Sequence, residues 1–201
     1  MKHPGPPFSA EIEQRLRAFT ELLLQWNARV NLVGRADTDS VWLRHVLDCA
    51  QLAPLLPAAS GTLIDLGSGA GFPGLILAIV TGWRVHLIDA DARKAAFLRE
   101  AARLTAADVA VHVTRVEQTR LEPADVVTAR ALAPLPRLLT LAVPLLARGG
   151  FCLFPKGRRV ADELTAAHRE WHMHVEQFPS QTDTTATLLR IREIRPVTHS
   201  A

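Results

Sequence analysis

The chain has 201 residues, of which 48% are hydrophobic and 21% are charged, and its formal net charge is +3. This length fits one domain, or one domain with an extension, and the apolar content suffices for a buried core. No apolar run approaches the ~20 residues of a membrane span, and no N-terminal stretch has the pattern of a signal peptide. The two cysteines form no Cys-x-x-Cys motif. We therefore expect a cytoplasmic protein with free cysteines, whose basic balance permits an RNA partner without demanding one.

The N-terminal part of the chain has the pattern of two helices. Apolar residues recur at helical spacing over residues 9–30. A second helix is predicted over residues 39–52, with an apolar face and with Arg44 and Asp48 four positions apart on the opposite side. Prolines then break the chain, so we expect residues 1–59 to form an N-terminal helical extension.

From residue 62 onward the hydrophobic pattern alternates between strand and helix. This alternation predicts a mostly parallel sheet with helices on both faces, and the last two strands, joined by a polar loop, predict a closing hairpin. The predicted strands are 62–66, 84–89, 109–114, 125–130, 150–155, 172–178 and 186–194. The predicted helices are 73–81, 91–104, 135–147 and 159–171. Residues 60–201 are thus expected to form one compact α/β unit with a seven-stranded sheet.

The stretch from Asp65 to Gly74 places a glycine-rich turn between a predicted strand and a predicted helix. Glycines let backbone N–H groups approach a ligand, so a nucleotide-like cofactor is the expected occupant. Two patterns overlap in this turn. Gly69-x-Gly71-x-x-Gly74 satisfies the dinucleotide fingerprint, which is weak evidence alone. Asp65-x-Gly67-x-Gly69-x-Gly71 is the first motif of S-adenosylmethionine (SAM) methyltransferases.

Asp65 favours SAM over a nicotinamide cofactor. Its carboxylate can neutralise the methionine ammonium of SAM, whereas NAD has no such cation and needs its pyrophosphate at a helix N-terminus. Asp89, roughly 20 residues beyond the glycines, is placed to bind ribose hydroxyls of either cofactor. A purely structural turn, a nicotinamide-dependent oxidoreductase and a non-catalytic RNA-binding module are the alternatives. The RNA-binding module would not need the acidic cofactor residues.

Charged residues end several of the otherwise apolar predicted strands. In an open α/β sheet, ligands bind at the carboxyl ends of the strands. A single charged residue at a strand end can simply be exposed to solvent. Charged residues at the ends of several strands instead favour a functional site along this edge of the sheet. The residues are Asp65, Asp89, Arg115, Glu117, Arg130 and Lys156.

At the level of motifs, the chain resembles the RsmG (GidB) family, bacterial methyltransferases that act on guanine N7 in 16S ribosomal RNA. The similarity extends from Trp26 to about Ile194. It rests on Trp26-Asn27-x-x-x-Asn31-Leu32, Arg44-His45-x-x-Asp48, the turn from Asp65 to Gly74, Leu87-Ile88-Asp89, Arg115-x-Glu117, Thr128-Ala129-Arg130-Ala131, Gly149-Gly150 and Lys156-Gly157. Phe154 and Pro155 depart from the small or aliphatic residues that usually precede the Lys-Gly pair.

This resemblance implies a Rossmann-like SAM-dependent methyltransferase that forms S-adenosylhomocysteine, uses no metal and acts as a monomer on 16S rRNA or the small-subunit particle. The residues expected at the cofactor are Asp65, Gly67, Ser68, Gly69, Gly71, Phe72, Asp89, Val116, Glu117 and Arg130. The residues expected on the RNA side are Arg44, His45, Asp48, Arg130 and Lys156. No catalytic residue is assigned, and Arg130, Lys156 and His45 are candidates for positioning the acceptor.

The chemistry of the acceptor atom is consistent with the absence of an obvious base motif. Guanine N7 carries a lone pair and no proton, so its methylation needs alignment of donor and acceptor rather than a general base. The sequence has neither an Asn/Asp-Pro-Pro-aromatic motif for exocyclic amines nor a Pro-Cys motif for carbon methylation. Methylation of another RNA atom, with His45 as base, is the alternative.

Overall fold

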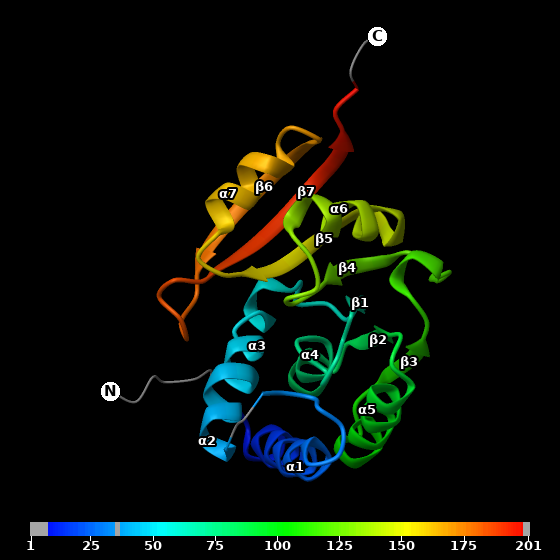
Figure 1. Ribbon diagram of the computed structural model, residues 1–201, viewed down its shortest axis with the longest axis vertical. Coiled ribbons are helices and arrows are strands. Elements are labelled where there is room, and N and C mark those ends of the chain that lie inside the picture. Colours follow the sequence, from blue (N-terminus) through cyan, green and yellow to red (C-terminus); the bar gives the residue numbers. More distant parts are fainter. Residues whose placement is uncertain (1–7, 35–36, 199–201) are drawn as a thin grey trace.

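The structure is a computed structural model that describes residues 8–34 and 37–198. Its centre is a seven-stranded sheet with the strand order β3-β2-β1-β4-β5-β7-β6 (Figure 1). Strands β1 to β5 run parallel, and β7 pairs antiparallel with both β5 and β6. The strands are β1 (Thr62–Leu66), β2 (Arg84–Asp89), β3 (Val109–Val113), β4 (Ala124–Thr128), β5 (Leu146–Lys156), β6 (Trp171–Pro179) and β7 (Thr187–Pro196). The predicted α/β class and the mostly parallel seven-stranded sheet are confirmed.

Helices cover both faces of this sheet. Because successive strand residues point to opposite faces, Leu63 packs with α1, α4 and α5, whereas Ile64 packs with α6 and α7. Figure 1 shows the first group beside the β1–β3 end and the second along the strands from β4 to β6. The helices are α1 (Ala10–Asn27), α4 (Gly74–Thr81), α5 (Ala92–Thr105), α6 (Leu135–Ala142) and α7 (Val160–Ala167).

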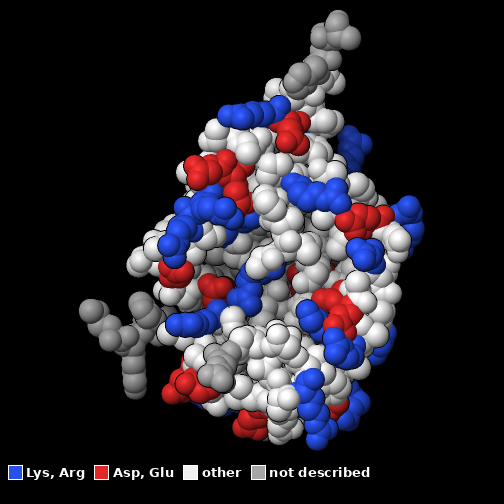
Figure 2. Space-filling model, in the orientation of Figure 1, with Lys and Arg blue, Asp and Glu red and all other residues white. Residues whose placement is uncertain are grey.

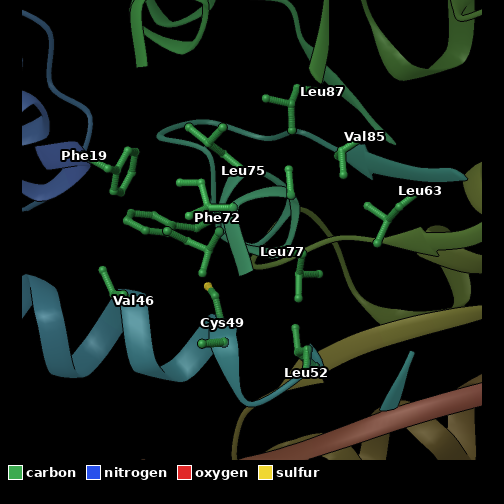
Figure 3. Packing of buried hydrophobic residues seen from close by; sticks show 14 of the residues in the cluster. Phe19, Val46, Cys49, Leu52, Leu63, Phe72, Leu75, Leu77, Val85 and Leu87 are labelled. Atoms are coloured by element: carbon green, nitrogen blue, oxygen red, sulfur yellow. The ribbon is translucent and has the colours of Figure 1, made fainter. Parts of the chain in front are cut away.

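The N-terminal helices share the core of the sheet domain. Phe19 of α1 is fully buried, and its ring centroid lies 5.6 Å from that of Phe72 and 6.0 Å from that of Phe97. Figure 3 shows Val46 and Cys49 pointing toward this same cluster from the helical segment that follows α1. A boundary at residue 59 between extension and domain stays a prediction, but the two parts are joined by one hydrophobic core.

The predicted second helix is continuous but changes its winding along its length. It consists of α2 (Thr38–Val41), a π-helical stretch η1 (Trp42–Leu47) and α3 (Asp48–Ala50). Single π-helical turns widen a helix and are frequent at functional sites. Here the π-helical stretch carries Arg44 and His45, two of the residues predicted on the RNA side.

Several predicted boundaries differ from those of the structure. Helix α6 ends at Ala142 and gives way to the 3-10 turn η4 (Val143–Leu145), because Pro144 has no N–H to continue the helix. Strand β5 begins at Leu146, earlier than predicted, and α7 ends at Ala167, before the chain enters β6. Two further 3-10 turns are η2 (Ala53–Leu55) and η3 (Val116–Gln118). Among the described residues, no helix is long and apolar enough to cross a membrane.

Candidate functional site

The glycine turn between β1 and α4 depends on glycine at two positions for different reasons. Gly67 has a φ of +67°, and a Cβ there would lie 2.8 Å from Cδ1 of Leu132. Gly74 begins α4, and a Cβ there would lie 2.6 Å from Cβ of Asp65. The first glycine permits the left-handed turn, and the second lets α4 pack against the end of β1.

Asp65 lies beneath this turn and is fully buried. Its Oδ2 accepts a hydrogen bond from the Gly74 amide at 3.1 Å, whereas its Oδ1 has no partner among the described residues. Burial raises the pKa of this carboxyl to about 7, although the nearby Ser68 hydroxyl and the Gly74 amide oppose the shift. A buried carboxylate oxygen without a donor is suited to a cationic group such as the ammonium of SAM. The predicted cofactor role of Asp65 stays a prediction.

Asp89 is fixed at the carboxyl end of β2 by two backbone amides. Gly69 donates to its Oδ2 and Asp91 donates to its Oδ1, each at 2.8 Å. Each carboxylate oxygen keeps further acceptor capacity, which a pair of ribose hydroxyls could use. Ser68, by contrast, is buried, and its hydroxyl joins the Asp65 carbonyl to the Ile88 amide. Ser68 therefore shapes the turn from behind.

A cavity of about 390 Å³ opens beside the glycine turn, within the range of small-molecule sites. Its wall includes the end of β2, the turn η3 and the segment after β4. The predicted cofactor residues that line it are Gly67, Gly69, Asp89, Val116, Glu117 and Arg130. The other four, Asp65, Ser68, Gly71 and Phe72, are not part of this wall. Glu117 forms an exposed ion pair with Arg137 at 2.7 Å.

A second and larger cavity, of about 970 Å³, lies next to the first. Four predicted RNA-side residues line it, namely Arg44, Asp48, Arg130 and Lys156. The space-filling view shows a hollow in this face of the molecule with both basic and acidic side chains around it (Figure 2). Arg130, Ala131 and Leu132 line both cavities, so this segment after β4 is their common wall. A methyl donor in the smaller cavity and an acceptor in the larger one would meet there.

Arg130 is held in place from several sides. Its Cζ lies 4.8 Å from the centroid of the Phe72 ring, a cation–π distance. Its Nη1 donates to Asp48 Oδ2 at 3.3 Å and to the Arg44 carbonyl at 3.4 Å. Its Nη2 lies 3.0 Å from Nδ1 of His45, whose ring stacks on Phe72 at 5.0 Å. The site residues of the N-terminal helices and of the sheet domain are therefore brought together at this guanidinium.

His45 takes part in this cluster as an uncharged acceptor. Burial, and next the positive charge of Arg130, lower the pKa of His45 to about 4, although Asp48 opposes the shift. Because a guanidinium can only donate, Nδ1 of the imidazole accepts the hydrogen bond from Arg130. His45 does not line either cavity.

The tip of the β6–β7 hairpin is bound to α3 through residues that the sequence did not single out. Thr182 Oγ1 donates to Asp48 Oδ1 at 2.7 Å, and Gln51 Nε2 donates to the same oxygen at 3.0 Å. The Gln181 amide donates to Gln51 Oε1 at 2.7 Å. Both Asp48 oxygens are thus engaged, one by Arg130 and one by this network. No spacing in the sequence signals a contact between segments so far apart.

Lys156 lies at the larger cavity, but its ammonium is engaged within the protein. Its Nζ lies 2.5 Å from Glu163 Oε2 and 3.3 Å from the Ala133 carbonyl, and only 8% of the side chain is exposed. Glu163 Oε2 also accepts from the Leu135 amide at 2.7 Å. Lys156 therefore anchors the segment between Arg130 and α6. Its predicted contact with RNA stays a prediction. Pro155 pairs with Leu188 inside the sheet and keeps Lys156 in register.

The fold is shared with solved structures of methyltransferases. Among solved structures, the ribosomal protein L11 methylase of Lactobacillus delbrueckii subsp. bulgaricus matches 74% of this chain and 78% of its own, with a TM-score of 0.61 and 16% identity. TYW2 of M. jannaschii, solved in complex with AdoMet, matches 76% of each chain with a TM-score of 0.57 and 12% identity. The chain has the fold of SAM-dependent methyltransferases.

Sequence comparison identifies the family within this class. A family model described as rRNA small subunit methyltransferase G (GidB) matches residues 12–189. The proteins named ribosomal RNA small subunit methyltransferase G from Rhodospirillum centenum and Granulibacter bethesdensis are 57% and 52% identical to this chain. These matches cover 94% and 96% of this chain and 87% and 91% of the relatives. The chain belongs to the rRNA small subunit methyltransferase G family, which confirms the resemblance and removes the oxidoreductase alternative.

Proposed function

We propose that this chain transfers the methyl group of SAM to N7 of a guanine in small-subunit (16S) ribosomal RNA. Membership of the family makes it a SAM-dependent rRNA methyltransferase. The proposal adds which atom of the RNA accepts the methyl group. When bound, SAM supplies a methyl group on a sulfonium, which is already an electrophile. The tasks of the protein are then to bind the donor, orient the acceptor and bring the two within reach.

The choice of N7 rests on the hydrogen bonds and ion pairs of the acidic groups around the two cavities. Each carboxylate lining them already accepts a hydrogen bond or forms an ion pair within the protein. These carboxylates are Asp48, Asp89, Glu117, Glu163 and Asp183. The lone pair of His45 Nδ1 is likewise engaged by Arg130. An acceptor atom that needs no proton removed suits a site whose carboxylates already have partners within the protein.

The cofactor side of the proposal uses residues from three strand ends. Asp89 would accept hydrogen bonds from the ribose hydroxyls, and the backbone at Val116 would face the adenine. Gly67 and Gly69 would leave room for the methionine part, with Asp65 beneath them to balance its ammonium. Support comes from the cavity that these segments enclose and from Oδ1 of Asp65, which has no hydrogen-bond partner within residues 8–34 and 37–198.

The RNA side of the proposal uses the larger cavity. Arg44 and Arg130 would face phosphate or guanine there, and Lys156 and Asp48 would fix the walls. We propose 16S rRNA or the small-subunit particle as the partner, the cytoplasm as the location and a monomer as the active form. The net charge of +3 and the basic side chains among those around the hollow support an anionic partner (Figure 2).

The test is to incubate the purified protein with SAM and small-subunit rRNA, digest the RNA and identify the methylated nucleoside by mass spectrometry. We expect 7-methylguanosine, and calorimetry should show one SAM per chain. Methylation of an exocyclic amine or of carbon would overturn the choice of N7. Tighter binding of NADH than of SAM would overturn the cofactor.

A further inference from the structure

The sheet face formed by β6 and β7 on the side away from α7 carries a row of basic side chains. Along β6, Met173 and Val175 pack into the core with α7, so the alternate residues His172 and His174 point to the opposite face and are exposed. Figure 1 shows α7 beside these two strands, whereas α1, α4 and α5 lie toward the other end of the sheet. This part of the sheet is therefore a surface.

Strand β7 adds arginines to that same surface by means of a β-bulge. Arg192 is paired with His174, and Arg195 is paired with His172, although the arginines are three residues apart and the histidines only two. The extra residue falls at Glu193, which has a φ of +53°. Without this bulge, an odd spacing would send Arg195 to the opposite face of the sheet. The bulge thus keeps both arginines on one face.

The charges on this surface are partly compensated by Glu176. This carboxylate forms an ion pair with Arg190 at 2.6 Å, and the charges of Arg192 and His174 also act on it. Arg192 lies with its Cζ 5.1 Å from the centroid of the Phe151 ring. Neither Arg192 nor Arg195 forms an ion pair with any residue in the described ranges 8–34 and 37–198. Both keep guanidinium donors available to an anion.

We propose that this surface, the β6–β7 basic face (His172, His174, Arg192 and Arg195), binds the phosphate backbone of the RNA outside the acceptor cavity. The inference rests on the proposed function, since it concerns the same substrate. Strand β7 begins beside the larger cavity, which Ala186 and Leu188 line, and runs away from it. RNA that leaves the cavity can therefore follow the strand.

The chemistry of this face matches a nucleic-acid backbone better than a protein surface. Its exposed groups are guanidinium and imidazole beside the Glu176 carboxylate. Met173 and Val175 of β6 pack on the other face with α7, and Phe178, on the same side as the histidines, packs against the core. Arginine matches phosphate geometry with two parallel N–H donors. A protein partner would instead require an apolar centre to its contact patch.

The experiment measures RNA binding by fluorescence anisotropy as salt is varied, using transcribed small-subunit rRNA and the double variant Arg192→Gln/Arg195→Gln. We expect affinity to fall about tenfold, and the slope of log affinity against log salt to fall by roughly 1.4, since each phosphate contact to a single strand contributes ~0.7. The KM for RNA should rise with little change in kcat. SAM affinity should be unchanged.

The matched control is Arg99→Gln/Arg103→Gln, which removes the same charge from exposed positions on α5. Equal losses of RNA affinity in both double variants would overturn the proposal, because they would show an effect of net charge alone. No loss of affinity in either variant would also overturn it. A loss seen with the small-subunit particle but not with RNA would also overturn it, in favour of a protein contact. If the double variant does not fold, Arg195→Gln alone should still lower the slope. A wild-type protein that methylates no RNA would instead refute the proposed function.

Discussion

Asp65, which is buried, and His45, which is half-buried, have pKa values shifted in opposite directions by the same cause. Burial disfavours the charged form of each group, so it raises the pKa of Asp65 to about 7 and lowers that of His45 to about 4. Near neutral pH, the imidazole is uncharged and the carboxyl is close to its titration midpoint. A cation arriving beside Asp65 would complete its ionisation, whereas His45 would keep its neutral form.

Asp65→Asn is expected to stabilise the free protein at pH 8 and to weaken SAM binding. The folded pKa of Asp65 is above its ordinary value of 3.8, so wild-type stability falls as pH rises from about 4 to 7. A shift of about three units sets an upper limit of about 4 kcal/mol on that loss. The asparagine can still accept from the Gly74 amide. Thermal unfolding at pH 4 and pH 8 checks this, and a variant less stable than wild type at pH 8 would contradict it.

The single-turnover rate of methyl transfer is expected to be nearly flat from pH 6 to pH 9. His45 titrates near pH 4, and N7 attack needs no proton removed. Rapid-quench measurements with saturating RNA and SAM, on wild type and on His45→Gln, provide the check. A tenfold rise per pH unit in this range, absent from His45→Gln, would identify His45 as a base and point to an acceptor other than N7.

At the scale of elements, three separate segments converge on the larger cavity through Asp48. One oxygen of this carboxylate accepts from Arg130, and the other accepts from Thr182 and Gln51. The helical segment around α3, the loop after β4 and the tip of the β6–β7 hairpin are therefore fastened to one another. The orientation of Arg130 depends on how this junction is assembled.

Asp48→Asn is expected to slow methylation about tenfold or more, because a hydrogen bond with a charged group contributes ~1.5–3 kcal/mol. Thr182→Val removes the hydroxyl that bonds Asp48, Gln51 and Ser180 but leaves the Arg130–Asp48 pair, and it should cost less than about fivefold. Single-turnover rates and melting temperatures of both variants separate orientation from folding. A wild-type rate in Asp48→Asn would show that the Arg44 carbonyl, His45 and Phe72 suffice to orient Arg130.

At the scale of the whole molecule, α1 is part of the enzyme's core and not an appendage. Leu16, Phe19 and Leu23 are fully buried against the sheet domain. Arg15 also reaches across to α5, where its Nε donates to the Thr105 carbonyl at 2.7 Å. Since burial of one such apolar side chain contributes ~1.5–3 kcal/mol, their sum is comparable to the whole stability of a domain, about 5–15 kcal/mol.

Phe19→Ala is therefore expected to lower the free energy of unfolding by about 3–5 kcal/mol, since it leaves a cavity among Phe72 and Phe97. Urea unfolding followed by circular dichroism measures this loss. Leu104→Ala is the matched control, because Leu104 is an exposed side chain on α5 and its truncation should cost little. A loss below about 1 kcal/mol in Phe19→Ala would mean that α1 packs only loosely.

The sequence alone determined the features that depend on local spacing. Alternating apolar periods specify the strands and helices, and the glycines specify the turn after β1. The acidic residue that ends β2 was recognised from its distance to that turn. Asp89 was predicted in this way, and it lines the smaller cavity beside the glycine turn.

Only the tertiary structure decided which distant segments meet. Asp48 and Thr182, separated by 134 residues, are joined because β7 returns antiparallel beside β5 and carries the hairpin tip to α3. The pairing of Lys156 with Glu163 likewise depends on how α7 folds back onto the sheet. Burial of Asp65 beneath α4, which sets its pKa, follows from packing and not from its place in a motif. Residue spacing fixes what is periodic along the chain, whereas strand order and packing fix what is close in space.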